Sequence, residues 1–190
     1  MARPTKSGAR SVAIELLESD HRKVEALFKR YEEAKEESEE AKQDVAEQVC
    51  DELTVHAQVE EDIFYPWLRE NLSEEDMEMV EEAEVEHATA KDLIGQIEDA
   101  ASPDETYDAK VKVLSEYIKH HVKEEEEEMF PKLAEFKEEL DELGQRMHAR
   151  KAELRAELGL TDEDEESMPA AAMAKAGKSG KGSARGAKRA

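Results

Sequence analysis

An eleven-residue motif that occurs twice carries the side chains best suited to chemistry. The first copy spans residues 56–66 and the second residues 121–131, and each begins with a histidine and ends with a proline. Four positions after the histidine each copy has a glutamate, Glu60 or Glu125. Because helical positions i and i+4 share a face, each copy directs an imidazole and a carboxylate at one point. This mixed donor set suits zinc, manganese, copper or non-haem iron.

Two further histidines stand in matching places upstream of the motifs. Asp20-His21 precedes the first motif, and Glu86-His87 precedes the second. His21 lies 35 positions before the first motif histidine and His87 lies 34 positions before the second. The chain is therefore interpreted as a duplicated helical hairpin, with a histidine on the first helix of each copy and His-x-x-x-Glu on the second.

The elements that must position these groups are four long amphipathic helices. Apolar residues recur at helical spacing, with a histidine inside each stripe, over residues 14–28, 45–67, 80–97 and 107–136. In the glutamate run 124–128 only Glu125 is in phase with His121, so the other glutamates should rotate toward solvent. His120 lies about 100° away from His121 on the same helix.

Local signals predict where these helices begin and end. Ser11 is the expected N-cap of the first helix, and the acidic stretch 32–40 should contain the next turn. Ser73 should cap the third helix, and Ser102-Pro103 should begin the fourth. Pro66 should kink the second helix or mark its last turns.

The expected fold class is all-α, an up-down-up-down four-helix bundle with a short extra C-terminal helix and disordered tails. Residues 1–10 are a disordered basic leader and residues 11–142 form the bundle. Residues 143–160 form a short accessory helix that stops at Gly159, with Leu154 and Leu158 packing on the outside. Residues 161–190 form a disordered tail, first acidic and then basic.

Charge and composition exclude several classes of protein. The net charge is −23 with 41 % charged residues, and the acid excess lies in residues 11–160. Such a body repels nucleic acid and anionic membranes, so only the basic tail could make weak nucleic-acid contacts. The single Cys50 precludes an internal disulfide, and we see no signal peptide and no membrane span. We therefore expect a cytoplasmic protein without a membrane partner.

The bundle should bring six polar side chains to one level of its core. Any one of these histidines alone is most simply a hydrogen-bonded core residue, but burying all six groups without a compensating charge would cost several kcal/mol. Six donors are too many for one tetrahedral zinc ion. If both glutamates bridge two octahedral metals, about two of about twelve coordination positions stay open once a solvent-derived bridge is counted. The six residues are His21, His56, Glu60, His87, His121 and Glu125.

The order Asp-His, His-x-x-x-Glu-Glu…Phe-Tyr-Pro, Glu-His, His-x-x-x-Glu-Glu…Phe-Pro resembles the hemerythrin-like, or HHE cation-binding, family over roughly residues 12–140. The resemblance implies two non-haem iron ions bridged by an oxo or hydroxo group, although other divalent metals remain an option. It implies the same six residues as ligands. It also implies binding of dioxygen or nitric oxide, iron sensing, or a response to oxidative or nitrosative stress.

One departure from the family pattern concerns the third helix. Hemerythrins that carry dioxygen resemble this chain but have a second histidine one turn from the third-helix ligand, where this chain has Ala83 and Lys91. The centre should therefore be more open. Glu84, Glu86 or water remain alternatives for the missing donor.

A ferritin-like di-iron arrangement is the competing interpretation. Glu18-x-x-His21 and Glu84-x-x-His87 both fit its Glu-x-x-His motif. That arrangement requires a lone glutamate on each of the other two helices, which here carry a histidine plus a glutamate. Glu18 and Glu84 then become candidates for outer groups that orient the histidines.

Three functions remain open from the sequence. The first is a module that binds dioxygen or nitric oxide or senses iron, and the second is an enzyme that reduces peroxide or nitric oxide. The third is a stress or interaction protein with a structural metal. No cysteine pair, flavin motif or nucleotide motif is present, so the enzyme would need an external electron donor, such as a redox partner protein.

Overall fold

The computed structural model describes residues 10–100 and 106–160, and within these ranges its regular secondary structure consists of helices joined by short turns. The helix formed by α2 continues through a π-helical turn into α3, and α5 continues through a π-helical and a 3₁₀ turn. The described residues therefore form five helical rods. The bounds are α1 Val12–Ala34, α2 Glu39–Val59, η1 Glu60–Phe64, α3 Tyr65–Asn71, α4 Met77–Glu98, α5 Tyr107–Glu124, η2 Glu125–Met129, η3 Phe130–Leu133 and α6 Lys137–Glu157.

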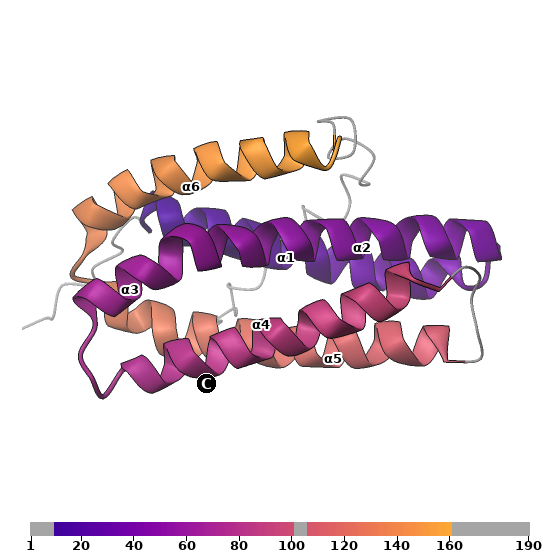
Figure 1. Cartoon of the computed structure of the whole chain (residues 1–190), viewed down its shortest axis with the longest axis horizontal. Helices are drawn as coiled ribbons and strands as arrows, with labels where there is room; N and C mark the ends of the chain where they lie inside the picture. The colour runs from indigo at the N-terminus through magenta and orange to yellow at the C-terminus, as the bar shows by residue number, and fades with distance from the viewer. Residues whose placement is uncertain (1–9, 101–105, 161–190) are drawn as a thin grey trace, which may run out of the picture.

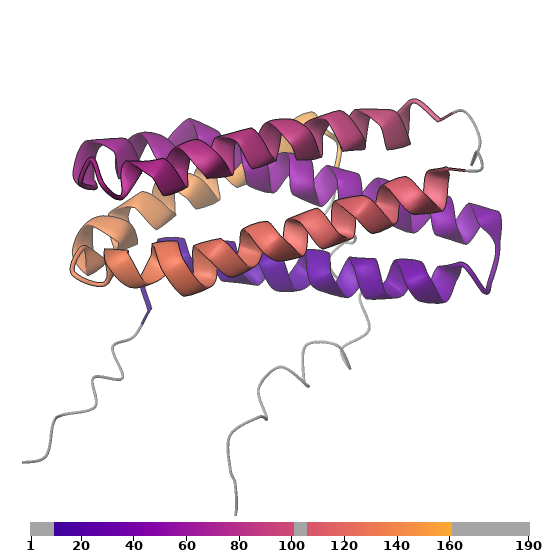
Figure 2. The same cartoon turned by 90° about the horizontal axis from the view of Figure 1, so that it is seen from below.

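Helices α1, α2, α4 and α5 run alongside one another (Figures 1 and 2). α1 packs on α2 and on α5, and α4 packs on α5 and on α2. Two hydrophobic clusters fill the space between them, one around Leu17, Leu68 and Leu133, the other around Val49 and Leu114. The histidines of the repeated motifs lie between these clusters, so apolar packing closes the polar layer from both ends.

The helix boundaries follow the local chemistry in part. α1 begins after Ser11 and ends before residues 35–38, and the Ser38 hydroxyl caps α2 by accepting a bond from the Ala41 amide at 3.1 Å. The prediction for the third helix is wrong, because α4 begins only at Met77 with Asp76 as its N-cap. Ser73 instead holds the preceding turn through a 2.7 Å bond to Asp76.

Both motifs contain a π-helical turn immediately before their proline. The Tyr65 amide bonds to the Glu60 carbonyl, and the Phe130 amide bonds to the Glu125 carbonyl, each five residues back. A proline in a continuing α-helix lacks a donor and collides with the carbonyl four residues earlier, and one wider turn relieves this. On the face of the helix that carries the motif glutamate, the next residue is therefore the fifth after it, Tyr65 or Phe130, rather than the fourth.

The last helix, α6, is longer than the short helix that the apolar pattern indicated. Its 21 residues bury Leu140, Leu143 and Met147, whereas Leu158 lies beyond its end and is 47 % exposed. Gly159 ends the helix with a left-handed backbone (φ 73°), a conformation that glycine adopts without a steric penalty.

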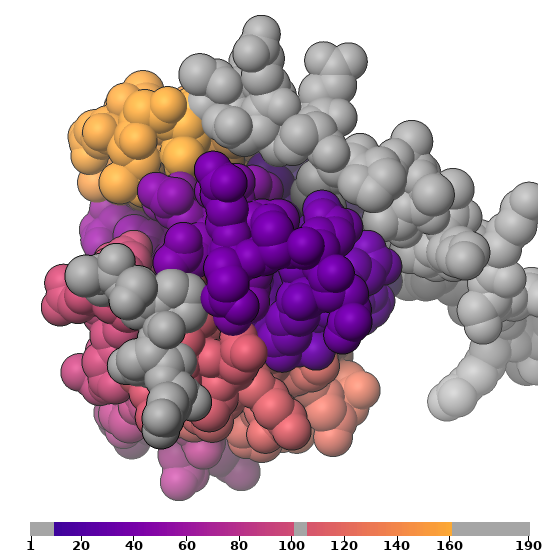
Figure 3. All heavy atoms as spheres, turned by 90° about the vertical axis from the view of Figure 1, so that its right-hand side faces the viewer, coloured from indigo at the N-terminus to yellow at the C-terminus, as the bar shows by residue number. Residues whose placement is uncertain are grey.

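Helix α6 packs on α1 and α2, on the side away from α4 and α5 (Figure 3). At Gly144 a β-carbon would lie 2.5 Å from the Ala13 amide nitrogen, so glycine permits the close approach of α6 to α1.

Several sequence predictions concern the chain outside the bundle core. The basic leader, the Ser102-Pro103 helix start and the C-terminal tail lie at 1–9, 101–105 and 161–190, outside the described residues. Cys50 is buried as a free thiol, and burial raises its pKa to about 12. No helix in the described part of the chain has the length and apolarity needed to cross a membrane.

Candidate metal centre

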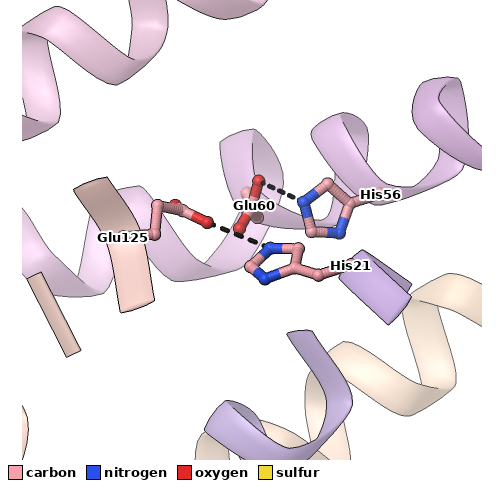
Figure 4. Close-up of side chains that lie close together, drawn as sticks. All are labelled: His21, His56, Glu60 and Glu125. Atoms are coloured by element: carbon pink, nitrogen blue, oxygen red, sulfur yellow. Dashed lines mark ion pairs between the residues drawn. The ribbon is translucent and has the colours of Figure 1, made fainter. Parts of the chain in front are cut away.

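The structure brings all six sequence-predicted side chains together at one level of the core. None of them is more than 5 % exposed, and both glutamates are almost completely buried. Figure 4 shows four of them pointing toward one another, His21 from α1, His56 from α2, Glu60 from η1 and Glu125 from η2. His87 of α4 and His121 of α5 complete the layer.

The donor atoms form two groups that a metal ion could occupy. One consists of His21, His56, Glu60 and Glu125, and the other of Glu60, His87 and His121, with ligand atoms in each group within 4.8 Å of one another. Glu60 belongs to both groups.

Each carboxylate lies between a histidine of one hairpin and a histidine of the other. Glu60 Oε2 is 3.2 Å from His56 Nε2 and 3.3 Å from His87 Nε2. Glu125 Oε2 is 3.2 Å from His21 Nε2 and 3.8 Å from His121 Nε2. Both carboxylates therefore face the first and the second hairpin at once.

Several atoms of the layer are buried without a hydrogen bond, among them His21 Nε2, both ring nitrogens of His56, Glu60 Oε1 and Glu125 Oε2. The close nitrogen–oxygen contacts are not aligned as hydrogen bonds. A buried polar atom without a partner is costly, and a bound cation would satisfy these atoms. The residues therefore fit a metal site by chemistry and by burial.

The charges of the layer are strongly coupled. Burial disfavours the imidazolium form of His21, but the carboxylates of Glu125 and Glu126 outweigh this and raise its pKa to about 9. Burial is likewise outweighed at His121, where Glu125 and Glu86 raise the pKa to about 9. The pKa of Glu125 falls well below its usual value because, although burial acts to raise it, His121 and His21 lower it further. The carboxylates thus favour the protonated form of His21 and His121 in the absence of metal.

A second layer of four carboxylates faces the outward nitrogen, Nδ1, of each histidine. In the first motif repeat Glu61 lies 3.1 Å from His87, and in the second Glu126 lies 2.9 Å from His21. The other two carboxylates belong to Asp20 and Glu86, the residues immediately before His21 and His87. These contacts are Glu86 to His121 at 2.8 Å and Asp20 to His56 at 3.6 Å.

This outer layer supports the orientation of three of the four rings. At His21, His87 and His121 a carboxylate within hydrogen-bond distance holds Nδ1 and leaves Nε2 directed inward, which is the usual support of a metal-binding histidine. Asp20 lies farther, 3.6 Å, from Nδ1 of His56. Three of the carboxylates also pair with a cation: Asp20 with Lys151, Glu61 with Lys91 at 2.5 Å, and Glu126 with Arg22 at 3.4 Å. The repeated Asp/Glu-His and Glu-Glu pairs thus each contain one inner and one outer residue.

Three sequence interpretations of the outer groups are corrected by these contacts. Glu18 pairs with Arg10 and Arg22, and Glu84 pairs with Arg69 at 2.6 Å, so neither orients a histidine. Glu86 contacts Nδ1 of His121 from outside the layer. Glu126 does not rotate to solvent, because its side chain is only 30 % exposed and bonds His21.

Glu126→Ala is therefore expected to weaken metal binding by about 10–100-fold, the usual effect of losing an outer partner of a ligand histidine. Glu127→Ala removes an adjacent exposed glutamate and is the matched control. Metal affinity measured by chelator competition checks this. Equal affinities for the two variants would show that the Glu126–His21 contact does not support the centre.

Tyr65 is a neighbour of the layer that the sequence reasoning missed. Its buried phenolic oxygen lies 3.2 Å from His87 Nε2 and 3.3 Å from Glu125 Oε1. Burial and the carboxylates of Glu60 and Glu125 raise its pKa well above the usual value. In a regular α-helix Phe64, four residues after Glu60, would lie on the same face as Glu60. The π-turn places Tyr65 on that face instead.

The equivalent position in the second repeat makes the two halves of the centre different. Phe130, the fifth residue after Glu125, stacks on His21 with ring centroids 6.1 Å apart and an interplanar angle of 5°. The His87 side of the centre therefore has a hydroxyl beside it, whereas the His21 side has a hydrocarbon ring. Tyr65 thus lies beside His87 of α4, the helix on which oxygen-carrying hemerythrins have a second histidine and this chain has Ala83 and Lys91.

A small cavity of about 20 Å³ adjoins the histidines. All four imidazoles contribute to its wall, and its exposed lining is almost entirely apolar, with Val24, Leu53, Ala90 and Ile94 among its members. A volume of this size holds one molecule no larger than a water or a diatomic gas.

An all-helical chain with a buried cluster of histidines and glutamates defines a class of helical metal-binding proteins. The model of the hemerythrin HHE cation binding domain matches residues 12–133, well over half of the 190 residues. The chain belongs to this family. Comparisons with curated proteins and with solved structures give no match. The matched residues include both groups of candidate ligands and end before α6.

Proposed function

We propose that this chain holds two non-haem iron ions in an up-down-up-down four-helix bundle of α1, α2, α4 and α5 and binds dioxygen or nitric oxide there. The ligands are His21, His56, Glu60, His87, His121 and Glu125. The observation that carries the proposal is the place of Glu60 and Glu125, each between a histidine of one hairpin and a histidine of the other. Iron in such a site supplies a redox-active centre to which a small molecule can bind.

The number and kind of these donors suit non-haem iron and do not match a calcium site or a closed structural zinc site. A structural zinc site is a closed set of four ligands, and calcium takes oxygen ligands only. The side chains alone leave coordination positions unfilled around two octahedral ions. An open position beside an apolar cavity suits a neutral diatomic ligand, because binding it costs no desolvation of charge.

Metal analysis and an optical spectrum test this proposal. We expect two irons per chain and an absorption spectrum that changes reversibly when the reduced protein meets dioxygen or nitric oxide. The proposal would be contradicted if the protein retained no iron after reconstitution. It would also be contradicted if neither gas changed the absorption spectrum. Sensing of iron or of oxidative stress would rest on the same centre, with loss of metal as the signal.

Filling the apolar cavity should separate ligand binding from metal binding. Ala90→Leu places a larger side chain against the histidines, which a bound gas would have to push aside. If that displacement costs about 1–3 kcal/mol, gas binding weakens by about 5–150-fold. Iron content should stay at two per chain. Ala88→Leu, on the exposed face of the same helix, is the control. Nitric oxide titration of both variants checks the result, and equal affinities would mean that the ligand does not use this cavity.

One observation favours the enzyme alternative, the reduction of peroxide or nitric oxide with an external electron donor. Such reductions build up charge on an oxygen atom of the substrate, and the Tyr65 hydroxyl, which lies 3.3 Å from Glu125 Oε1, is a hydrogen-bond donor beside the centre. Stable adducts with the gases support binding, whereas rapid oxidation of the reduced protein without an adduct supports turnover.

A further inference from the structure

A second cavity, of about 40 Å³, reaches the same centre from another side. It lies between α4 and the end of α5, and its lining differs sharply from that of the apolar cavity. Within the described part of the chain it has no lysine or arginine in its lining. Its titratable lining residues are Glu82, Glu86, His121, Glu124, Glu125 and Glu128.

The carboxylates that line this cavity range from exposed to buried. Glu82 and Glu128 are exposed, Glu124 is partly buried, and Glu125 is 1 % exposed. Glu125 Oε2 has no hydrogen bond, although it is buried. The cavity is thus lined both by exposed carboxylates and by the buried Glu125 of the centre. A concave surface with charge of one sign concentrates ions of the opposite sign.

A group of three donors stands beside this cavity. Glu86, His120 and Glu124 bring ligand atoms within 4.8 Å of one another. His120 Nε2 is 3.1 Å from Glu124 Oε1 and 4.0 Å from Glu86 Oε1, and the His120 side chain is 58 % exposed. Two carboxylates and one imidazole suit iron, manganese or zinc, and the exposure of His120 leaves room for water on the ion.

Glu86 joins this surface group to the buried layer. Its Oε1 faces His120. Its Oε2 forms a 2.8 Å hydrogen bond with Nδ1 of His121. A cation held by Glu86, His120 and Glu124 is thus one side chain away from His121 and shares a cavity with Glu125. Among the described residues, the acidic side chain in the lining of the apolar cavity is Asp20, which pairs with Lys151.

We propose that Glu86, His120 and Glu124 form a surface site that captures a divalent cation, ferrous iron in the first place, and that the adjoining carboxylate-lined cavity delivers it to Glu125. This inference rests on the proposed metal centre and assigns how the centre is filled. Metal and small neutral ligand then reach the centre by separate routes, the cation past carboxylates and the gas through the apolar cavity.

The test is the rate at which the metal-free full-length chain takes up Fe²⁺ under anaerobic conditions. The double variant H120A/E124Q should load about ten-fold or more slowly than the wild type, the lower end of what electrostatic guidance supplies. It should still reach the same iron content and the same spectrum. The double variant H148A/E127Q removes an exposed histidine and an exposed glutamate elsewhere and should load at the wild-type rate.

The outcomes separate this inference from the proposed function. Wild type that takes up no iron contradicts the centre itself. A double variant that loads as fast as wild type overturns the surface route and leaves the centre intact. A variant that never reaches the wild-type iron content also overturns it, because His120 or Glu124 would then be part of the centre.

An equilibrium measurement tests the surface site directly. Iron-loaded protein titrated with Mn²⁺ should bind one further ion weakly, detected by the loss of the free Mn²⁺ resonance signal. The H120A/E124Q protein should lose this binding, and the H148A/E127Q protein should keep it. Equal Mn²⁺ binding by all three proteins would overturn the site.

Discussion

Replacing Glu125 by alanine is expected to abolish binding of both irons, lowering metal affinity by more than about 100-fold. Loss of an outer partner alone costs about 10–100-fold, and Glu125 is a candidate ligand to both ions. Its Oε2 lies 3.2 Å from His21 Nε2 and 3.8 Å from His121 Nε2, so its loss removes a carboxylate from between two of the candidate ligands. Iron content after desalting and affinity by chelator competition measure the effect.

The controls come from the same run of glutamates. Glu127→Ala removes an exposed carboxylate two positions away and should bind two irons with wild-type affinity. Glu124→Ala and His120→Ala should reach the same final iron content, though more slowly if the surface site operates. Equal iron loss in Glu127→Ala and Glu125→Ala would show that the helical phase assigned to this run is incorrect.

Removing the metal is expected to lower the melting temperature by about 5–10 °C at slightly alkaline pH. Iron at a hundred-fold excess over its dissociation constant stabilises the folded state by about 2.7 kcal/mol. For a chain of this size, 1 kcal/mol corresponds to about 2–4 °C. The apolar clusters at either end of the layer remain packed without metal, so the stripped protein should stay helical. Thermal unfolding with and without a chelator measures the difference.

The pH dependence of this difference follows from the two raised histidine pKa values. In the metal-free protein His21 and His121 have pKa values of about 9, above the value of about 6.5 in an unfolded chain. Their protonation therefore stabilises the metal-free fold below pH about 6.5, and this contribution disappears as the pH rises through about 9. Metal must displace these protons, so its stabilisation should grow over the same interval.

The chelator-sensitive shift in melting temperature should thus be small at pH 6 and largest near pH 9. An isolated histidine would place this change near pH 6, and the carboxylates of the layer move it upward. A shift that is constant from pH 6 to 9 would mean that metal does not compete with protons at these histidines. Coincident curves throughout would favour the interpretation of the cluster as hydrogen-bonded core residues.

Local pattern was sufficient to predict the helical class and the meeting of the six side chains. The apolar stripes place His21, His56, His87 and His121 on buried faces, and all four are at most 5 % exposed. Helical phase depends only on backbone geometry, so it is readable from residue spacing. The same reasoning selected Glu125 from a run of five glutamates, and Glu125 is the buried one.

Local pattern was not sufficient wherever a contact joins two helices or the helix departs from α geometry. Glu126 was assigned to solvent because its own helix turns it outward, yet α1 brings His21 within 2.9 Å of it. Tyr65 was missed because the π-turn at Glu60 advances the phase by one residue, which α periodicity does not contain.

The tertiary structure alone decided which polar groups support the histidines and how the centre can be reached. Glu18 and Glu84 lie one helical turn from a histidine, but each pairs with an arginine instead. The carboxylates that lie beside the outer nitrogens of the histidines come from neighbouring helices, and they are Asp20, Glu61, Glu86 and Glu126. The amino-acid sequence by itself determined the inner donors, because spacing along one helix sets their direction. Outer partners and cavities depend on the rotation and separation of packed helices, which spacing along a single helix does not specify.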